Sequence, residues 1–302
     1  AQGAESAAVK LLETVTIPKN KSGYSYGIRL KSGNITLDLN GCTIQTTGGT
    51  SSFAPLDAVF YINDGSSLTV QGSSTGGKIV QPNGGQAIHV GSNGTLTVES
   101  GVTIEVTSND ESSFSSSAPI TDQNCAVFLN GGGTANILGG TLTGKQGIYV
   151  KNGTLSVSGG TIHGKNSYAL QVAENAVTTN KSKVQLSGGS YTTDVTDGCS
   201  IWNADGTAAA LLASGYRYQD DNGKESAYSE NNNGVVGNTT IAVRPANEFA
   251  YMGADGTEQT HAGCTELTAA GFTDVVADGT AWFAANTSFT ADRPLQVCGT
   301  VN

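Results

Sequence analysis

One short apolar motif recurs along this chain and constrains its fold more than any other feature of the sequence. Each copy is an extended quartet with apolar residues at the second and usually the fourth place, followed by a Thr/Ser-rich stretch and a Gly-led turn. The copies recur at intervals of roughly 20–40 residues, the range in which a repeat indicates stacked structural units. The quartets are Gly27-Ile28-Arg29-Leu30, Val59-Phe60-Tyr61-Ile62, Ala87-Ile88-His89-Val90, Ala126-Val127-Phe128-Leu129, Gly147-Ile148-Tyr149-Val150, Ala169-Leu170-Gln171-Val172 and Ser200-Ile201-Trp202-Asn203.

Two further segments repeat after each quartet. The first alternates Leu or Val with a polar residue, as in Thr95-Leu96-Thr97-Val98, and the second is a shorter strand after the glycines, as in Gly160-Thr161-Ile162. Period-two alternation places the apolar residues on one side of a strand and the polar residues on the other. Three strands per repeat, each with one inward apolar edge, predict an all-β fold, a parallel β-helix with three strands per coil.

The chain divides into four regions. Residues 1–24 begin with Ala, Val and Leu among good helix formers, which predicts a short amphipathic helix that caps the first coil. Residues 25–205 carry the repeats, interrupted by excursions at 46–55 and 107–124. Residues 206–245 are interpreted as a last irregular coil or hairpin, and residues 246–302 as a small β-rich extension or spacer. The final run, 295–302, resembles an incomplete strand pair, so either a longer protein was processed or a neighbouring molecule completes the strand.

Charge and cysteine usage exclude several classes of partner. The net charge is −10 with scattered acids, which argues against nucleic acid or an anionic membrane as partner. No apolar run is long enough for membrane insertion. Five cysteines do not form a closed disulfide framework, although Cys264 and Cys298 could pair. No Cys/His cluster indicates zinc.

One position of each quartet predicts a row of side chains along the stack. The residue between the two inward aliphatics points outward, because successive side chains of a strand alternate. Adjacent coils lie about 4.8 Å apart, so these residues form a continuous ladder rich in aromatic rings. The ladder is Arg29, Tyr61, His89, Phe128, Tyr149, Gln171 and Trp202, and the matching row of the second strand is Asp38, Thr69, Thr97, Asn136, Ser156 and Gln185.

Two interpretations of the ladder stay open. Exposed apolar strips usually mark contact surfaces, and flat rings with polar edges suit the C–H faces of sugars, which predicts a glycan-binding strip. Large exposed apolar patches are rare on monomers, however, so a loop, the C-terminal part or a second molecule could cover the ladder instead. The predicted binding residues are Tyr61, His89, Phe128, Tyr149, Gln171 and Trp202.

The positions of acidic residues bear on both catalysis and metal binding. A glycosidase needs two carboxylates roughly 5–10 Å apart, and Asp194 with Asp197 is the best candidate pair. No cofactor is expected except for a conceivable calcium ion, which takes oxygen ligands from loops. An Asn-Gly turn explains the same loop without a metal. The residues of this loop are Asp220, Asp221, Asn222 and Glu225.

The phrase Ile35-Thr36-Leu37-Asp38-Leu39-Asn40-Gly41-Cys42-Thr43-Ile44, preceded by Val15-Thr16-Ile17-Pro18, carries a family resemblance. Together with the later Gly-Thr-Leu-Thr-Val and Ser-Gly-Gly-Thr-Ile coils, it resembles the right-handed β-helix modules of large secreted surface proteins of Gram-positive gut bacteria. The resemblance covers roughly residues 9–245. It implies a right-handed β-helix at an extracellular or cell-surface location, with adhesins and surface stalks as the associated functions.

Three classes of function follow. The preferred one is a non-enzymatic protein that binds glycans or a host surface through the ladder. The second is a structural stalk or filament subunit whose chain ends self-associate by strand complementation. The third is a polysaccharide-cleaving β-helix enzyme.

Overall fold

The fold is taken from a computed structural model. It describes residues 6–18, 26–47, 58–73, 75–82, 85–107, 124–165, 167–174, 182–194, 199–220, 233–236, 240–246, 249–252, 258–261, 265–266 and 283–284. Several predictions fall on residues outside these ranges. They are most of the excursions 46–55 and 107–124, the Cys264–Cys298 pair, Asp197, the calcium ligands Asp221, Asn222 and Glu225, and the last run, 295–302.

Three large sheets contain most of the described strands, and we name them sheets A, B and C. In order across each sheet, sheet A holds β1 (Ser6–Lys10), β4 (Asn34–Asp38), β7 (Ser67–Gln71), β10 (Thr95–Val98), β13 (Gly133–Ile137), β16 (Gly153–Val157) and β19 (Lys183–Leu186). Sheet B holds β2 (Val15–Ile17), β5 (Thr43–Thr46), β8 (Gly77–Gln81), β11 (Val102–Val106), β14 (Thr141–Gly144), β17 (Thr161–Gly164), β20 (Ser190–Thr193), β24 (Thr240–Pro245) and β22 (Tyr216–Asp220). Sheet C holds β3 (Tyr26–Leu30), β6 (Ala58–Ile62), β9 (Gln86–Val90), β12 (Cys125–Leu129), β15 (Gln146–Val150), β18 (Leu170–Val172), β21 (Cys199–Asn203) and β23 (Gly234–Val236).

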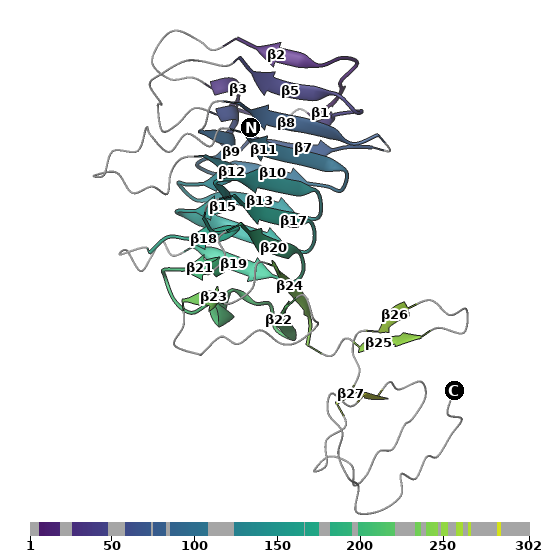
Figure 1. The fold of residues 1–302 in the computed structure, drawn as a ribbon. Coiled ribbons are helices and arrows are strands. Elements are labelled where there is room, and N and C mark those ends of the chain that lie inside the picture. The colour runs from purple at the N-terminus through teal and green to yellow at the C-terminus, as the bar shows by residue number, and fades with distance from the viewer. Residues whose placement is uncertain are drawn as a thin grey trace, which may run out of the picture. The chain divides into compact units, whose positions relative to one another are not determined.

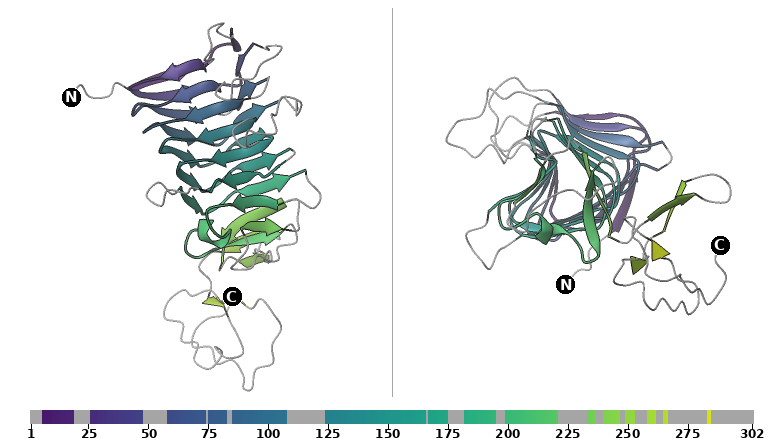
Figure 2. Two further views of the ribbon diagram at one scale, coloured as in Figure 1. Left: turned by 90° about the vertical axis from the view of Figure 1, so that its left-hand side faces the viewer. Right: turned by 60° about the horizontal axis from the view of Figure 1, so that its bottom comes forward.

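Consecutive strands enter the three sheets in turn. Strand β7 lies in sheet A, β8 in sheet B and β9 in sheet C, and β10 then returns to sheet A beside β7 (Figure 1). Strands from successive circuits pair in parallel. The second view in Figure 2 shows the three sheets arranged around a common interior. The chain is therefore all-β and solenoid-like, with three mostly parallel sheets, as the repeats predict.

The interior is built from columns of aliphatic side chains. In sheet C, Ile88, Val127 and Ile148 stand opposite one another in successive strands, and Leu170 continues the column. All four are fully buried. Each buried aliphatic side chain contributes on the order of 1.5–3 kcal/mol, so the columns supply most of the stabilisation of the stack. Matching columns are Leu68, Leu96, Ala135 and Leu155 in sheet A and Ile79, Ile104, Leu142 and Ile162 in sheet B.

The crowding around Gly147 explains why its quartet begins with glycine. A Cβ atom at this position would clash with Cγ2 of Ile162 and would lie 2.7 Å from the carbonyl oxygen of Ala169. The backbone of β15 therefore passes close to sheet B and to the next coil. Only a very small residue fits there without moving backbone atoms.

The prediction of an N-terminal capping helix is wrong. Residues Ser6–Lys10 form strand β1, which pairs in parallel with β4 and places Ala7 opposite Ile35 and Val9 opposite Leu37. Helix propensity is a weak preference that tertiary pairing overrides. Alternation of Ala7 and Val9 with their polar or small neighbours suits the edge of sheet A, and β1 becomes its first strand. No α-helix occurs anywhere in the described ranges, where the only helical element is the 3₁₀ turn η3 (Ala209–Leu211).

The stack ends differently at its C-terminal side. Strand β24 pairs antiparallel with β20 in sheet B, and β23 pairs antiparallel with β21 in sheet C. Two fully buried tyrosines support this end: the hydroxyl of Tyr218 donates to the carbonyl oxygen of Ala208 at 2.7 Å, and that of Tyr191 donates to the carbonyl oxygen of Gly188 at 3.1 Å. Two of the three sheets therefore include a reversed strand at this end.

The chain forms two compact units. The first comprises residues 1–213 and 218–243, and the second comprises residues 214–217 and 244–302. In the second unit β25 (Phe249–Met252) pairs antiparallel with β26 (Glu258–His261), and β27 (Thr265–Glu266) pairs in parallel with β28 (Phe283–Ala284). Among the residues that the structure describes, no helix has the length and apolarity needed to cross a membrane.

Candidate functional site

The predicted ladder exists as one continuous row on sheet C. Each ladder residue stands directly opposite the next in adjacent strands, so the register read from the quartets is confirmed. The polar row on sheet A needs one correction. Thr36, not Asp38, is in register with Thr69, and Asp38 stands opposite Gln71 instead.

The rings of the ladder contact one another along the stack. The guanidinium carbon of Arg29 lies 5.4 Å from the ring centre of Tyr61, and Tyr61 meets His89 edge to face at 4.7 Å. The ring centres of His89 and Phe128 lie 4.8 Å apart, with the rings tilted to one another. The ring of Phe128 stacks on that of Tyr149, with 5.5 Å between the ring centres. Such contacts contribute about 0.5–1.5 kcal/mol each beyond the area that they bury. The row is therefore a packed column of rings.

Most of this column is buried. His89 is 4% exposed, Phe128 1% and Tyr149 3%. Phe128, Tyr149 and Cys125 form a hydrophobic cluster against which Ala173 packs. The middle of the ladder thus matches the covered alternative, and only Arg29 is exposed, with Tyr61 and Trp202 half-buried at the two ends. Binding of a ligand by the six ladder residues stays a prediction.

Sequence reasoning missed a second row beside the ladder. Gln146 donates from Nε2 to Oε1 of Gln171, and Tyr168 stacks on Trp202 at 5.8 Å. Gln146 precedes its own ladder residue by three places, which in a regular strand would put it on the opposite face. Gln146 is nevertheless buried and contacts the ladder residue Gln171 through its amide. We call the buried side chains of this face the outer layer: His89, Cys125, Phe128, Gln146, Tyr149 and Gln171.

Burial changes the electrostatics of His89. Removal from water lowers the pKa of its imidazole from 6.5 to about 4, because desolvation penalises the charged form. Its Nδ1 atom is buried and has no hydrogen-bond partner among the described residues. The side chain is therefore neutral at pH 7 and behaves as part of the apolar packing.

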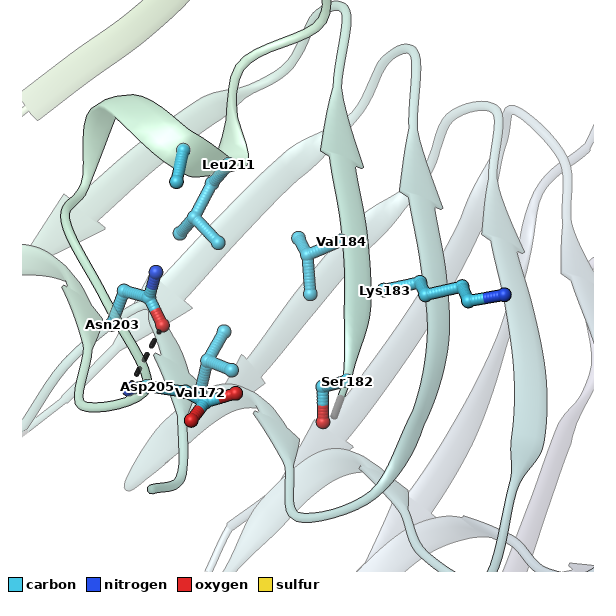
Figure 3. Close-up of a pocket in the computed structure, with 8 residues that line it drawn as sticks. Val172, Ser182, Lys183, Val184, Asn203, Asp205 and Leu211 are labelled. Carbon is cyan, nitrogen blue, oxygen red and sulfur yellow. Dashed lines mark hydrogen bonds between the residues drawn. The ribbon is translucent and has the colours of Figure 1, made fainter. Parts of the chain in front are cut away.

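A pocket of about 260 Å³ lies near the last coils (Figure 3). Val172, Val184 and Leu211 supply apolar walls. Both polar atoms of the Asn203 side chain already form hydrogen bonds within the protein. Nδ2 donates to the carbonyl oxygen of Thr207, and Oδ1 accepts a hydrogen bond from the backbone N–H of Asp205. Figure 3 shows the ammonium end of Lys183 extending away from these walls. The pocket therefore offers few polar groups that converge on one point, as a specific small-molecule site requires.

Sheet B brings two titratable side chains together at its surface. His163 contacts Asp194 through Nε2 and Oδ1 at 2.8 Å, on the surface of sheet B. No group of three or more His, Cys, Asp or Glu side chains lies together among these residues. Cys42 is a half-buried free thiol, and Cys125 is buried.

The first coil is the most exposed apolar region of the described stack. All five residues of β1 are exposed, with Val9 at 43%, and Leu12 just beyond it is 86% exposed. Ile28 and Leu30 in β3 are only half-buried, although their counterparts in later coils are buried. Strands β1, β2 and β3 each form the edge of their sheet. This end therefore presents both apolar side chains and strand edges to solvent, the combination that favours pairing with another strand.

Comparison of the chain with protein-family models, curated proteins and solved structures gives no match. The function must accordingly be argued from the geometry of the first coil, the outer layer and the exposed ends of the ladder.

Proposed function

We propose that this chain is a non-enzymatic structural module, a right-handed parallel β-helix with three strands per coil that serves as a rigid stalk and joins a neighbour through its first coil. The observation that carries the proposal is the asymmetry between the two ends of the stack. Among the described residues, β1, β2 and β3 are edge strands with parallel neighbours, whereas the other end of the stack contains the antiparallel strands β24 in sheet B and β23 in sheet C. An open, apolar strand edge favours association with further β-structure.

The outer layer supports the stalk function. Sheet C has buried side chains on both faces along its middle strands, from β9 to β15. Packing on both faces resists bending of the sheet, because close-packed interiors transmit strain and compress little. With the family resemblance, this favours an extracellular or cell-surface location for the stalk.

Sedimentation velocity over a range of protein concentrations tests the proposal. We expect association that grows with concentration, and we expect Val9→Lys to abolish it, because the substitution places a charge on the exposed apolar edge. Leu138→Lys is the matched control, since Leu138 is 54% exposed but lies after β13, far along the stack from β1. A wild-type chain that stays monomeric at every concentration contradicts the proposal.

Glycan binding at the accessible ends of the ladder is the second candidate function. The half-buried Tyr168–Trp202 stack offers aromatic surface at the end of the ladder, and such surface suits the C–H face of a sugar ring. On a glycan array we expect Trp202→Ala to reduce binding at least tenfold, the effect of roughly 1.4 kcal/mol. Phe128→Leu, a change inside the outer layer, should leave binding unchanged. An array on which no glycan binds removes this candidate.

A further inference from the structure

We infer that two copies of this chain join head to head, by antiparallel pairing of their β1 strands around a two-fold axis at Ala8. The inference rests on the proposed function and adds to it the identity of the neighbour and the register of the contact. Two-fold symmetric contacts are the commonest form of self-association.

Strand β1 lacks the devices that protect natural sheet edges. Its sequence, Ser6 to Lys10, contains no proline and a single charge. The Nζ atom of Lys10 lies 4.0 Å from Oδ2 of Asp38 in the adjacent strand. The charge of Lys10 is therefore partly balanced within the same molecule. Edge strands that must stay unpaired usually carry several charges, a bulge or a proline. Strand β1 is therefore competent to accept another strand.

The other end of the stack favours head-to-head over head-to-tail contact. Sheet C ends with β23, which runs antiparallel to β21, and in sheet B the antiparallel strand β24 is followed by β22. A first coil that approached this end would meet a reversed strand at the edge of sheet C and could not continue the parallel pairing in all three sheets. A second first coil presents the same three open edges, and two open edges of sheet A can pair antiparallel.

The sequence of β1 is complementary to itself when the pairing is centred on Ala8. All five residues then pair: Ala7 meets Val9 of the partner subunit on the inward face, and Ser6 meets Lys10 of the partner subunit on the outward face. Ala8 meets its own counterpart. The apolar columns of the two copies thus become continuous, and no two like charges stand opposite one another, which is the condition for a stable cross-strand pair.

Disulfide trapping tests this register. In antiparallel pairs, opposite Cα atoms lie about 4.5–5.5 Å apart, within the range that a disulfide spans. We expect oxidised Ala8→Cys to yield a dimer in which peptide mass spectrometry finds the two introduced cysteines linked to each other, which separates this link from links through the native cysteines. Leu12→Cys is the matched control: it is highly exposed, but its two copies would lie roughly 27 Å apart in this pairing.

A second pair of variants tests the same register if the Ala8→Cys protein does not fold. A mixture of Ser6→Cys and Lys10→Cys chains should give a disulfide between the two introduced cysteines of different copies, and neither variant alone should give a link through its new cysteine. Suppose that wild-type chains associate, but neither Ala8→Cys nor this mixture forms a disulfide between the introduced cysteines, or Leu12→Cys forms one equally well. The head-to-head register is then wrong, and the proposal that the chains join at their ends still stands. If no association occurs at any concentration, both proposals are wrong.

Discussion

At the scale of single residues, His89 shows how position in the stack sets chemistry. The quartet motif correctly predicts the register of His89, and it also predicts that Tyr61 and Phe128 are its neighbours in the adjacent strands. Its ionisation behaviour was not readable. An exposed histidine in a row of rings would titrate near its ordinary pKa, whereas the buried side chain has a pKa of about 4.

The lowered pKa of His89 makes the stability of the protein depend on pH. The unfolded chain takes up a proton near pH 6.5 and the folded chain only near pH 4, so the contribution of His89 is fully present above pH 6.5 and is lost as the pH falls towards 4. The free energy of unfolding should decrease by at most about 1.4 kcal/mol per pH unit within this window. His89→Phe keeps a ring between Tyr61 and Phe128 but cannot titrate.

Urea denaturation of the wild type and His89→Phe at pH 7 and pH 5 measures this contribution. Carboxylates titrate in both proteins, so the difference between the two pH dependences isolates the histidine. We expect the variant to lose less stability than the wild type between pH 7 and pH 5. Equal losses would show that His89 is solvated in the folded protein.

At the scale of elements, β1 and sheet C depart from the sequence-based expectations for different reasons. The run of Ala, Val and Leu in the first residues has good helix propensity, but pairing with β4 decides its structure. The side chains of sheet C have the predicted register but are covered on their outer face. Propensity and alternation describe a strand by itself, whereas pairing and cover depend on segments distant in the sequence.

The outer layer should contribute to stability as a second core. Phe128→Ala should lower the free energy of unfolding by about 3–5 kcal/mol, the usual effect of removing a buried phenylalanine ring. Trp202→Ala removes a larger but half-buried ring and should cost less. Denaturant titrations of the two variants test this order. A Phe128→Ala protein as stable as the wild type would mean that the row is accessible to water, which would restore the open glycan-binding strip.

At the scale of the whole molecule, the stack should behave as a series of nearly independent coils. Deletion of residues 130–150 joins Leu129 to Lys151 and removes β13, β14 and β15, one strand from each sheet. Each coil contacts mainly its neighbours, so the shortened protein should fold with an unchanged circular dichroism spectrum and a modestly lower Tm. Deletion of residues 130–140 removes β13 alone and disrupts the order of the three sheets, and this control should not fold. Failure of both deletions to fold would contradict the coil-by-coil description.

The sequence by itself determined the repeat, the order of strands around three sheets, the apolar columns and the row from Arg29 to Trp202. These features depend on alternation within a strand and on the interval between strands, and both are local properties of the chain. Only the tertiary structure decided that residues 6–10 form a strand, that the rings of the row are buried and that the two ends of the stack differ. Burial and edge pairing arise from contacts between segments far apart in the sequence, and no local pattern encodes which partner a face or an edge will meet.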